Sequence, residues 1–434
     1  MGNKHFIYII FVLLIIPIFI FSKIPDNVVK NPKDTLNINV NFDDPVVRML
    51  DSLSNLTFFC KNHLKDTLTN SYNDLFANIN PEFSDSVYTE RLKILNSKTP
   101  CNLVFNDLVK KYINVYANQK RKLTSRVLGL SKIYFPVFEE ILDKYNVPLE
   151  LKYLAIVESA LNPVAVSPAN AAGLWQFIKG TGKLYQLNNN YLTDDRFDIY
   201  KSTDAAARHL RDLYNEFHNW DLVLAAYNAG AGAVKRAIVR AGGSYDFYRI
   251  YPFLPKETRA YVPAFIAVNY IMNYADEHNI QTTDAVIEHT DIDTVMVSNP
   301  LSFKQIAEMF KITEEEISFL NPAYRKGIIP ASANNKYVLR LPKDYISMFI
   351  NNENNLYAFK STTQNQLLLS QKQNLSQPYG VHTVKKGESL HKLAKKYNCS
   401  ISQLQKWNKL KNHFIHPGQK LKISKDFTET SYNN

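Results

Sequence analysis

One glutamate, Glu158, lies in the middle of the apolar stretch LKYLAIVESALNP at residues 151–163. On a helical wheel it shares a stripe with Leu154, Ala155 and Leu161, so we expect a helix that is buried nearly all round. Burial disfavours the charged form of a carboxyl group and can raise its pKa from about 4.3 to about 6. Such a group can donate a proton at neutral pH, as a general acid for glycoside cleavage must.

An ion pair is the alternative explanation for a charged residue in such a helix. Buried carboxylates are often held by an arginine from another helix, and Arg196 and Arg208 are the candidates here. The helical pattern around Glu158 leaves both interpretations open.

Three later stretches contain residues suited to binding a sugar: SPANAAGLWQFIKGTG (167–182), AAYNAGAGAV (225–234) and LPKETRAYVP (254–263). Aromatic rings can stack on sugar faces, amides can bond N-acetyl and hydroxyl groups, and glycines allow close backbone approach. Each residue taken singly could equally be ordinary packing. The candidates for substrate binding are Ser159, Ser167, Gly173, Trp175, Gln176, Tyr227, Asn228 and Tyr261.

Together and in this order, the ES pair, GLWQF, AYNAG and ETRAYVP closely resemble the lytic transglycosylase domain, specifically that of the membrane-bound type D murein enzymes. The resemblance covers roughly residues 100–425. It implies a lysozyme-like fold and makes Glu158 the sole catalytic acid and base. It also implies that Ser167 and Gln176 bind or orient substrate, that Tyr227 lies beside the carboxyl group, and that Asn228 lines the groove.

The implied reaction is the non-hydrolytic cleavage of the β-1,4 bond between N-acetylmuramic acid and N-acetylglucosamine in peptidoglycan. Glu158 would protonate the glycosidic oxygen and then, as carboxylate, accept the proton of the muramoyl C6 hydroxyl, which closes on C1 as a 1,6-anhydro ring. One carboxyl group suffices, whereas hydrolytic glycosidases usually need two. No cofactor and no metal are expected.

A lysozyme-like hydrolase and a catalytically silent wall-binding protein are the competing hypotheses. A hydrolase needs a second carboxylate, for which the sequence offers Asp194, Asp195, Asp198 and Glu257. We expect these residues to cap helices or bind arginines instead. The pair His413 and His416 is too isolated to indicate a metal site.

Helical periodicity persists from about Val104 to about His278, which predicts an all-α catalytic domain at residues 101–285. The predicted helices are Val104–Asn118, Ser131–Tyr145, Pro148–Leu161, Ser202–Phe217, Trp220–Ala229 and Arg259–Tyr274.

An internal repeat follows this domain. The stretches beginning at Ile306 and Leu393 align without a gap at an offset of 87 residues, and both contain a capping box, TxxE in the first and SxxQ in the second. Short β-rich stretches flank both copies. Each copy therefore predicts a small βααβ module, at residues 286–345 and 379–425, with a polar linker at 346–378 between them.

The second copy resembles the LysM module, a domain that binds peptidoglycan and chitin. Its matching stretches are HTVKKGESLHKLAKKY, ISQLQKWN and IHPGQKLKI. The resemblance makes Gly387, Asn408, Pro417 and Gly418 the candidate glycan-binding residues. The first copy lacks the PGQ close and is interpreted as a degenerate module that packs on the catalytic domain.

The charge of the chain is concentrated near its end. The net charge is +11, and residues 379–425 contain eleven lysines against one acid, Glu388. Such a patch suits nucleic acid or an anionic wall polymer equally well. Because the N-terminus predicts export, nucleic acid is excluded as the partner of this patch.

The N-terminus carries an apolar run from Phe6 to Phe21 flanked by Lys4 and Lys23. We interpret residues 1–22 as an uncleaved membrane anchor or a signal peptide, which places the chain in the periplasm or cell envelope. A polar region, residues 23–100, follows. With three cysteines, free buried thiols are a simpler expectation than a Cys60–Cys101 bridge. Peptidoglycan strands are the expected partner of a monomeric enzyme.

Overall fold

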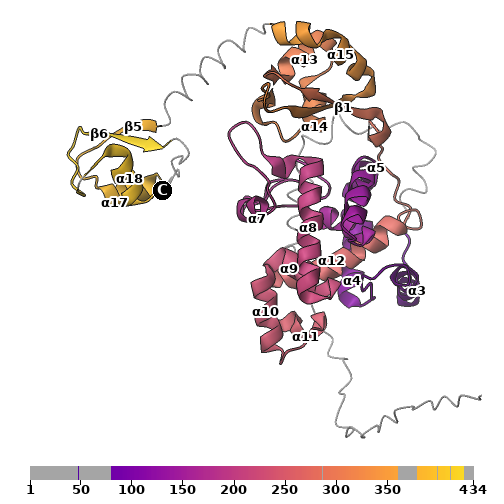
Figure 1. Ribbon diagram of the computed structural model, residues 1–434. Coiled ribbons are helices and arrows are strands. Elements are labelled where there is room, and N and C mark those ends of the chain that lie inside the picture. Colours follow the sequence, from indigo (N-terminus) through magenta and orange to yellow (C-terminus); the bar gives the residue numbers. More distant parts are fainter. Residues whose placement is uncertain are drawn as a thin grey trace, which may run out of the picture. The chain divides into compact units, whose positions relative to one another are not determined.

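The computed structural model describes residues 47, 80–285, 287–359, 379–397, 399–410 and 412–424. The predicted anchor or signal segment, residues 1–22, lies outside these ranges, as do Cys60 and most of the predicted polar region. The architecture is mainly α, as predicted: a helical domain is followed by two small modules with short strands (Figure 1).

Helices make up the regular structure of residues 80–285. The α-helices are α3 (Asp85–Asn96), α4 (Asp107–Asn114), α5 (Arg121–Lys144), α6 (Leu154–Ser159), α7 (Lys179–Leu184), α8 (Ile199–Phe217), α9 (Trp220–Ala229), α10 (Ala231–Arg240), α11 (Phe247–Ile250) and α12 (Lys256–Asn273). The other helical turns are a π-helix, η2 (Val115–Gln119), and the 3₁₀ turns η3 (Leu149–Tyr153), η4 (Asp195–Phe197) and η5 (Tyr251–Phe253).

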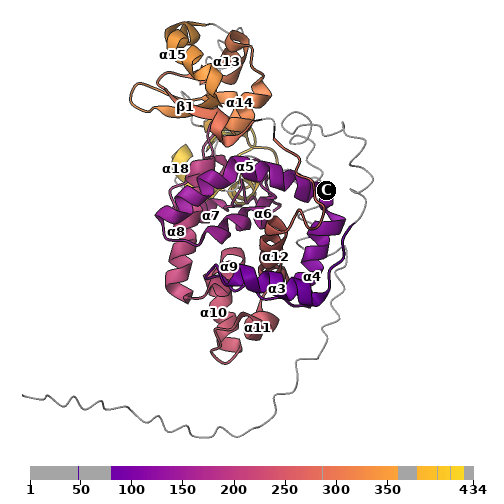
Figure 2. The same ribbon diagram turned by 90° about the vertical axis from the view of Figure 1, so that its right-hand side faces the viewer.

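Helix α12 runs through the centre of this domain. Its sequence is apolar on nearly every side, and most of its residues are buried, including Val262, Phe265 and Val268. Helices α4, α6 and α9 pack against it, as Figures 1 and 2 show. A helix that is apolar all round needs such a covered position. Tyr261 is thereby held inside the domain.

The predicted single helix Pro148–Leu161 is wrong in its bounds. Residues 149–153 form the 3₁₀ turn η3, and α6 ends at Ser159 because Ala160 and Leu161 both adopt left-handed backbone, with φ of 49° and 59°. Helix α9 has the predicted bounds. The reversal after α6 leaves Glu158 in the last turn of a short helix.

Helix α3 lies in the stretch predicted to be a polar region outside the catalytic domain, and this prediction is wrong for residues 85–96. Leu92 is 1% exposed, and Arg91 donates a hydrogen bond of 2.7 Å to the hydroxyl of Tyr270 on α12. The ring of Tyr88 packs edge-on against that of Tyr270. The helical domain therefore begins before residue 100.

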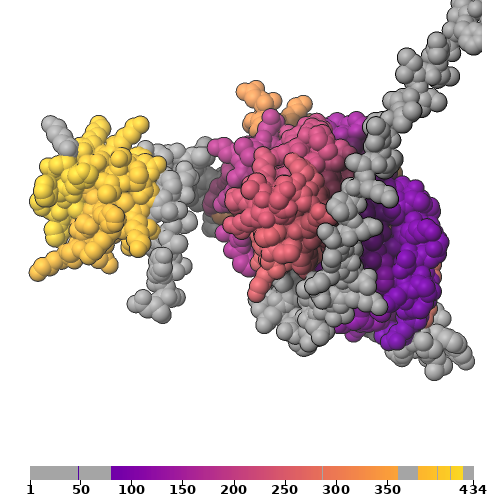
Figure 3. All heavy atoms as spheres, turned by 90° about the horizontal axis from the view of Figure 1, so that it is seen from below, coloured from indigo at the N-terminus to yellow at the C-terminus, as the bar shows by residue number. Residues whose placement is uncertain are grey.

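Helices α10 and α11 were not predicted and form one end of the domain with α9, seen from below in Figure 3. Gly230, with φ of 82°, separates α9 from α10 and allows the chain to turn between them. This turn follows Asn228, so it fixes where the AYNAG segment leaves the helix.

The first module, residues 287–359, contains the predicted βααβ order in β1, α13, α14 and β4, with additional short elements. Its elements are η6 (His289–Asp291), β1 (Ile292–Val297), β2 (Leu301–Ser302), α13 (Phe303–Phe310), α14 (Glu314–Leu320), η7 (Arg325–Gly327), β3 (Ile328–Ile329), β4 (Tyr337–Pro342) and α15 (Lys343–Ala358). Strands β1 and β4 pair antiparallel, from Ile292 opposite Pro342 to Val297 opposite Tyr337.

The linker predicted at 346–378 begins too early, because residues 346–358 belong to helix α15. Phe349 and Leu356 of this helix are buried in the core of the first module, and Gln305 donates a hydrogen bond of 2.8 Å to the carbonyl of Phe359. The module therefore extends to residue 359, and the rest of the predicted linker lies outside the described residues.

The second module consists of β5 (Tyr379–Thr383), α17 (Leu390–Lys396), α18 (Ile401–Asn408) and β6 (Lys420–Ser424), with β5 and β6 antiparallel. It has the predicted βααβ order. The capping boxes predicted from the repeat are present in both modules, at Thr313 with Glu316 and at Ser400 with Gln403.

Candidate active site

Glu158 lies among apolar side chains, as its sequence predicts. Leu154, Ala155 and Leu161 are fully buried, while Glu158 as a whole residue is partly exposed. Ala160 and Leu161, which end α6 directly after Glu158, adopt left-handed backbone conformations. Such conformations cost energy in residues other than glycine. Such strain is characteristic of functional sites.

The carboxyl group of Glu158 has one hydrogen-bond partner among the described residues, the phenol of Tyr261, which donates to Oε1. Burial raises the pKa of Glu158 to about 7, and the bond from Tyr261 lowers it by a smaller amount. At neutral pH a large part of the population is therefore protonated and can act as an acid.

The alternative ion pair with an arginine does not form. Arg196 binds Asp194 at 2.9 Å, and Arg208 binds Asp204 at 2.8 Å. Each guanidinium also donates to backbone carbonyls, so neither is available to Glu158.

The other acidic candidates have structural partners or lie at the surface. Asp194 and Asp198 cap the helical turns that follow them, and Asp195 binds Lys201 at 2.8 Å. Glu257 is exposed in the first turn of α12. Among the described residues, no carboxylate contributes to the shifted pKa of Glu158.

Tyr227 and the rings next to it form an aromatic wall near Glu158. The Tyr227 hydroxyl donates to the carbonyl of Trp175 at 2.8 Å, and the charge of Glu158 helps to raise the pKa of this phenol, after the larger effect of burial. The ring of His209 lies 5.2 Å from that of Tyr227, and the ring of Tyr185 lies 5.1 Å from that of His209, measured between centroids.

Sequence reasoning missed Tyr185, His209 and Thr258. Burial lowers the pKa of His209 to about 4, so its imidazole is neutral at physiological pH and offers a donor and an acceptor. The hydroxyl of Thr258 donates to Oδ1 of Asn228 at 2.8 Å and orients that exposed amide. Tyr185 and His209 stand outside the sugar-binding motifs, and no spacing pattern in the sequence marks them.

Ser167 and Gln176 lie at the two ends of one compact loop segment and are both partly exposed. Ser167 Oγ accepts a hydrogen bond from the amide of Ala171 at 3.1 Å. The Gln176 amide donates to the carbonyls of Gly173 and Ala165 at 2.8 and 3.2 Å, with its own backbone at φ 47°. Their polar groups are thus held in place by backbone contacts.

Four of the predicted substrate-binding residues are buried, namely Ser159, Gly173, Trp175 and Tyr261, of which Tyr261 contacts Glu158 as described above. Trp175 is 0% exposed, packs on Phe138 and donates to the hydroxyl of Thr203 at 2.9 Å, so its ring does not form a sugar platform. Ser159 is also 0% exposed, and its hydroxyl contacts the carbonyls of Ala155 and Leu174 at 2.9 Å. Ser159 joins α6 to the GLWQF segment, and Trp175 joins that segment to α5 and α8.

Gly173 is required by close packing. Its φ is 81°, and a Cβ at this position would lie 2.0 Å from the carbonyl oxygen of Arg196. Only glycine allows that approach. Gly173 therefore allows close approach of the Arg196 backbone, where the sequence had suggested close approach of a ligand.

Comparison with known families matches three parts of the chain. Residues 136–248 match the Transglycosylase SLT domain, residues 291–358 match the LysM-like domain of the lytic transglycosylase MltD, and residues 382–424 match the LysM domain. The membrane-bound lytic murein transglycosylase D of Escherichia coli strain K12 is 32% identical over 324 residues, which cover 73% of this chain and 69% of that protein. The chain belongs to the lytic murein transglycosylase D family. It is a lytic transglycosylase with a lysozyme-like catalytic domain.

Two further matches cover smaller parts of the chain. A putative soluble lytic murein transglycosylase of Haemophilus influenzae is 34% identical over 151 residues, which cover 33% of this chain and 25% of that protein. The solved 70 kDa soluble lytic transglycosylase of Escherichia coli shares 26% identity, with a TM-score of 0.29, over 36% of this chain and 27% of the other.

In this transglycosylase D relative, the candidate LysM residues fall into two groups. Gly387, Pro417 and Gly418 are exposed in two loops, which are joined where the amide of Gly418 donates to the carbonyl of Val384 at 2.8 Å. A Cβ at Gly387 or Gly418 would have no described neighbour within 4 Å, so no part of the described module packs on these turns.

Asn408, the remaining candidate, has a structural role. Its amide donates to the carbonyls of Leu404 and Lys422 at 2.9 Å, and its oxygen accepts from the amide of Lys422. Asn321 makes the equivalent contacts in the first module, with the carbonyls of Ile317 and Arg340 and with the amide of Arg340. The shared asparagine therefore joins a helix to a strand in both copies, and these contacts give Asn408 a structural role whether or not it also binds glycan.

Three further features of the described residues bear on the predictions. None of their helices is both long and apolar enough to cross a bilayer. Within the same ranges, no group of three or more metal-ligating side chains is found. Cys101 is buried with a free thiol, whose pKa burial raises to about 12.

Proposed function

We propose that Glu158 cleaves the β-1,4 bond between N-acetylmuramic acid and N-acetylglucosamine without water, leaving a 1,6-anhydromuramoyl end. The observation that carries this proposal is a carboxyl group with a pKa of about 7 that is bonded to Tyr261, with no second carboxylate of the described residues acting on it. A group that is partly protonated at neutral pH can serve as an acid and then as a base.

The first step breaks the glycosidic bond. The protonated Glu158 gives its proton to the glycosidic oxygen as the C1–O bond breaks, and the N-acetylglucosamine side leaves with a hydroxyl. Positive charge develops at muramoyl C1, where the 2-acetamido group assists. Glu158 is now a carboxylate, and the hydrogen bond from Tyr261 stabilises its charge.

The second step closes the ring. The muramoyl O6 attacks C1 while its hydroxyl proton passes to the Glu158 carboxylate, which restores the acid. The proton lost in the first step is thus regained, and no water is consumed. A groove that holds the sugar so that O6 reaches C1 before water does would favour this outcome.

The groove residues supply that positioning in the proposal. The ring of Tyr227 and the neutral His209 provide an aromatic surface on one side of the carboxyl group. The partly exposed Ser167 and Gln176 and the exposed Asn228 provide hydroxyl and amide groups for the N-acetyl and hydroxyl substituents.

Digestion of purified murein followed by mass spectrometry tests the reaction. We expect muropeptides that are lighter by one water than hydrolytic products, together with their loss in Glu158→Gln, which should still sediment with murein. Hydrolytic products without the anhydro ring would contradict the proposal. Asp198→Asn provides a control, because asparagine can still cap α8.

The lysine-rich module at 379–425 supplies affinity for the wall polymer in this proposal, through the exposed loops at Gly387 and Pro417-Gly418. Exposed charges act through solvent, so the contribution should weaken as salt rises. Deletion of residues 379–434 should reduce sedimentation with murein at low salt; unchanged sedimentation would contradict this role.

For the location of the enzyme, we infer export to the periplasm or cell envelope, with residues 6–21 as an anchor if they are not cleaved. The apolar run itself and the name of the Escherichia coli relative, which calls that protein membrane-bound, support this inference. Fractionation of cells into soluble and membrane parts tests it. We also propose that the enzyme acts as a monomer, which light scattering of the purified chain can check.

A further inference from the structure

The first LysM-like module contacts the catalytic domain at the loop of residues 188–198, which lies between α7 and α8. The amide of Asp194 donates to the carbonyl of Ala323 at 3.0 Å, and the amide of Arg325 donates to the carbonyl of Leu192 at 2.7 Å. The guanidinium of Arg325 also donates to the carbonyl of Asn190 at 3.2 Å. The module therefore holds this loop by backbone and side-chain bonds.

Asp194 is the centre of this contact. Its side chain is 0% exposed and accepts hydrogen bonds from two guanidinium groups, those of Arg325 in the module and Arg196 in the catalytic domain. Arg196 binds it through two nitrogens, at 2.9 and 3.0 Å. A buried carboxylate that is shared in this way has little freedom to move, because its charge must remain paired.

Arg196 continues the contact to the substrate-binding loop. Its Nη1 donates to the carbonyls of Asn170 and Phe177 at 2.7 and 3.0 Å. Its own carbonyl oxygen is packed against Gly173. These three points all lie in the segment 167–177, which carries Ser167 and Gln176.

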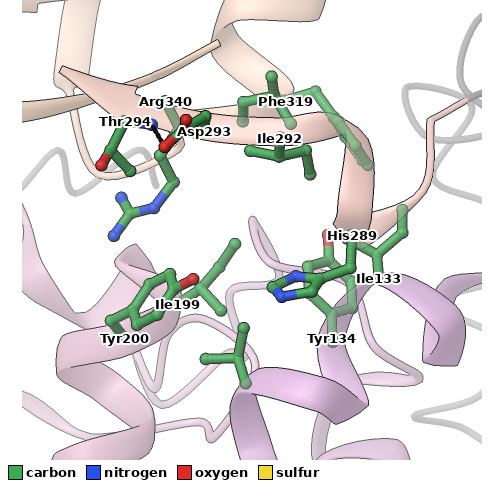
Figure 4. A pocket seen from close by; sticks show the side chains of 12 residues that line it. Ile133, Tyr134, Ile199, Tyr200, His289, Ile292, Asp293, Thr294, Phe319 and Arg340 are labelled. Atoms are coloured by element: carbon green, nitrogen blue, oxygen red, sulfur yellow. Dashed lines mark hydrogen bonds between the residues drawn. The ribbon is translucent and has the colours of Figure 1, made fainter. Parts of the chain in front are cut away.

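The other contact between module and domain is less closely packed. The guanidinium of Arg340 lies 4.5 Å above the ring of Tyr200 and 3.4 Å from Asp198, beside a cavity of about 210 Å³ (Figure 4). Its buried Nε has no hydrogen-bond partner among the residues that the structure describes. A cavity between the two surfaces means fewer direct contacts between protein side chains, so the Arg325 side is the stiffer connection.

The geometry points to Arg325 as a positioning residue for the glycan groove, acting through Asp194 and Arg196 on the segment 167–177. The expected effect on turnover rests on the proposed function. The contacts from Arg325 through Asp194 and Arg196 to the segment 167–177 do not depend on that proposal. The degenerate module thereby acquires a role other than binding glycan: it sets the shape of the site in the neighbouring domain.

Three variants test the connection by hydrogen exchange and kinetics on the full chain. Arg325→Ala removes the guanidinium, Arg325→Lys keeps the charge but loses the planar fork, and Lys336→Ala removes an exposed charge of the same module. In Arg325→Ala we expect faster amide exchange in residues 167–177 and 188–196, with α9 and α12 unchanged. We expect KM for soluble glycan strands to rise about threefold to tenfold, with a smaller change in kcat.

Arg325→Lys should lie between wild type and Arg325→Ala, and Lys336→Ala should match wild type. Unchanged exchange at 167–177 would overturn the proposal, and so would an equal rise throughout the domain, which would indicate only lost stability. If Arg325→Ala does not fold, the same criteria apply to Arg325→Lys. Altered exchange at 167–177, in an enzyme whose wild type gives no anhydro products, would support the connection while contradicting the proposed reaction.

Discussion

The phenol of Tyr261 donates a hydrogen bond to Oε1 of Glu158, joining the central helix α12 to the last turn of α6. Burial raises the pKa of Glu158 and this bond lowers it, so the value of about 7 is the balance of two opposing effects. Burial also raises the pKa of Tyr261 well above its usual value, which keeps the phenol a donor throughout the working range.

Tyr261→Phe should move the alkaline limb of the pH–rate profile to higher pH. Removal of the donor leaves burial unopposed, so the pKa of Glu158 rises above about 7. The rate at the optimum should fall about tenfold to a hundredfold, because the carboxylate formed in the first step loses a charged hydrogen bond. Turnover of solubilised murein across the pH range measures both effects.

Tyr227→Phe is the matched control, since the Tyr227 hydroxyl bonds the carbonyl of Trp175 and not Glu158. Its alkaline limb should move less than that of Tyr261→Phe. A limb that stays in place in Tyr261→Phe, or moves to lower pH, would contradict the assignment of that limb to Glu158.

Glu158→Gln should change how stability depends on pH. Because the pKa of Glu158 is raised on folding, the native state binds more protons than the unfolded state between pH 4.5 and about 7, and stability falls as pH rises through that window. Glutamine does not titrate, so the stability of the variant does not fall in this way as pH rises. At pH 8 it should therefore be more stable than wild type by about 1–3 kcal/mol, and near pH 4 the difference should be small.

Urea unfolding of both proteins at the two pH values measures this difference. A gain in stability that is the same at pH 4 and pH 8 would show that desolvation of the carboxylate is not its cause.

Asn408→Ala and Asn321→Ala should destabilise their modules by similar amounts. Each asparagine satisfies two carbonyls and one amide that join a helix to a strand, so its loss leaves those groups without their partner. A cost of about 1–3 kcal/mol per module is expected.

The effect on binding separates this structural role from glycan recognition. If Asn408 is structural, Asn408→Ala should bind murein normally at a temperature where the module remains folded, whereas a substitution at the exposed Gly387 should weaken binding. Lost binding by a folded Asn408→Ala protein would restore the original prediction.

The sequence was sufficient to predict the environment of Glu158, the repeat and its capping boxes, because these depend on local periodicity. It failed where burial depends on distant parts of the chain. Trp175 and Gln176 are adjacent, yet one is fully buried beneath α8 and the other partly exposed, and no local pattern distinguishes them. Their difference arises from Phe138 and Thr203, which lie on α5 and α8.

Composition misled the interpretation of α15 for a related reason. The stretch NNENN resembles a linker, but the apolar residues around it, Ile346, Phe349 and Leu356, fall on one face of a helix that the module core covers. Asparagine-rich segments can thus be helical when a few well-spaced apolar residues find a partner surface.

Gly173→Ala should prevent the GLWQF segment from adopting its observed position. The new Cβ would lie 2.0 Å from the carbonyl oxygen of Arg196, and alanine rarely adopts a φ of 81°, so both sterics and backbone strain oppose it. We expect a loss of about 3 kcal/mol or more, together with loss of activity, measured by thermal unfolding and murein digestion.

Gly180→Ala, seven residues along the chain, provides the comparison. Its Cβ would meet nothing within 4 Å, and the residue lies in helix α7, where alanine is favoured by about 0.5–1 kcal/mol. This variant should therefore be as stable as wild type or slightly more stable. Equal stability of the two variants would show that Gly173 and Arg196 do not pack as closely in solution as the structure indicates, and the route from Arg325 to the groove would lose one of its three contacts.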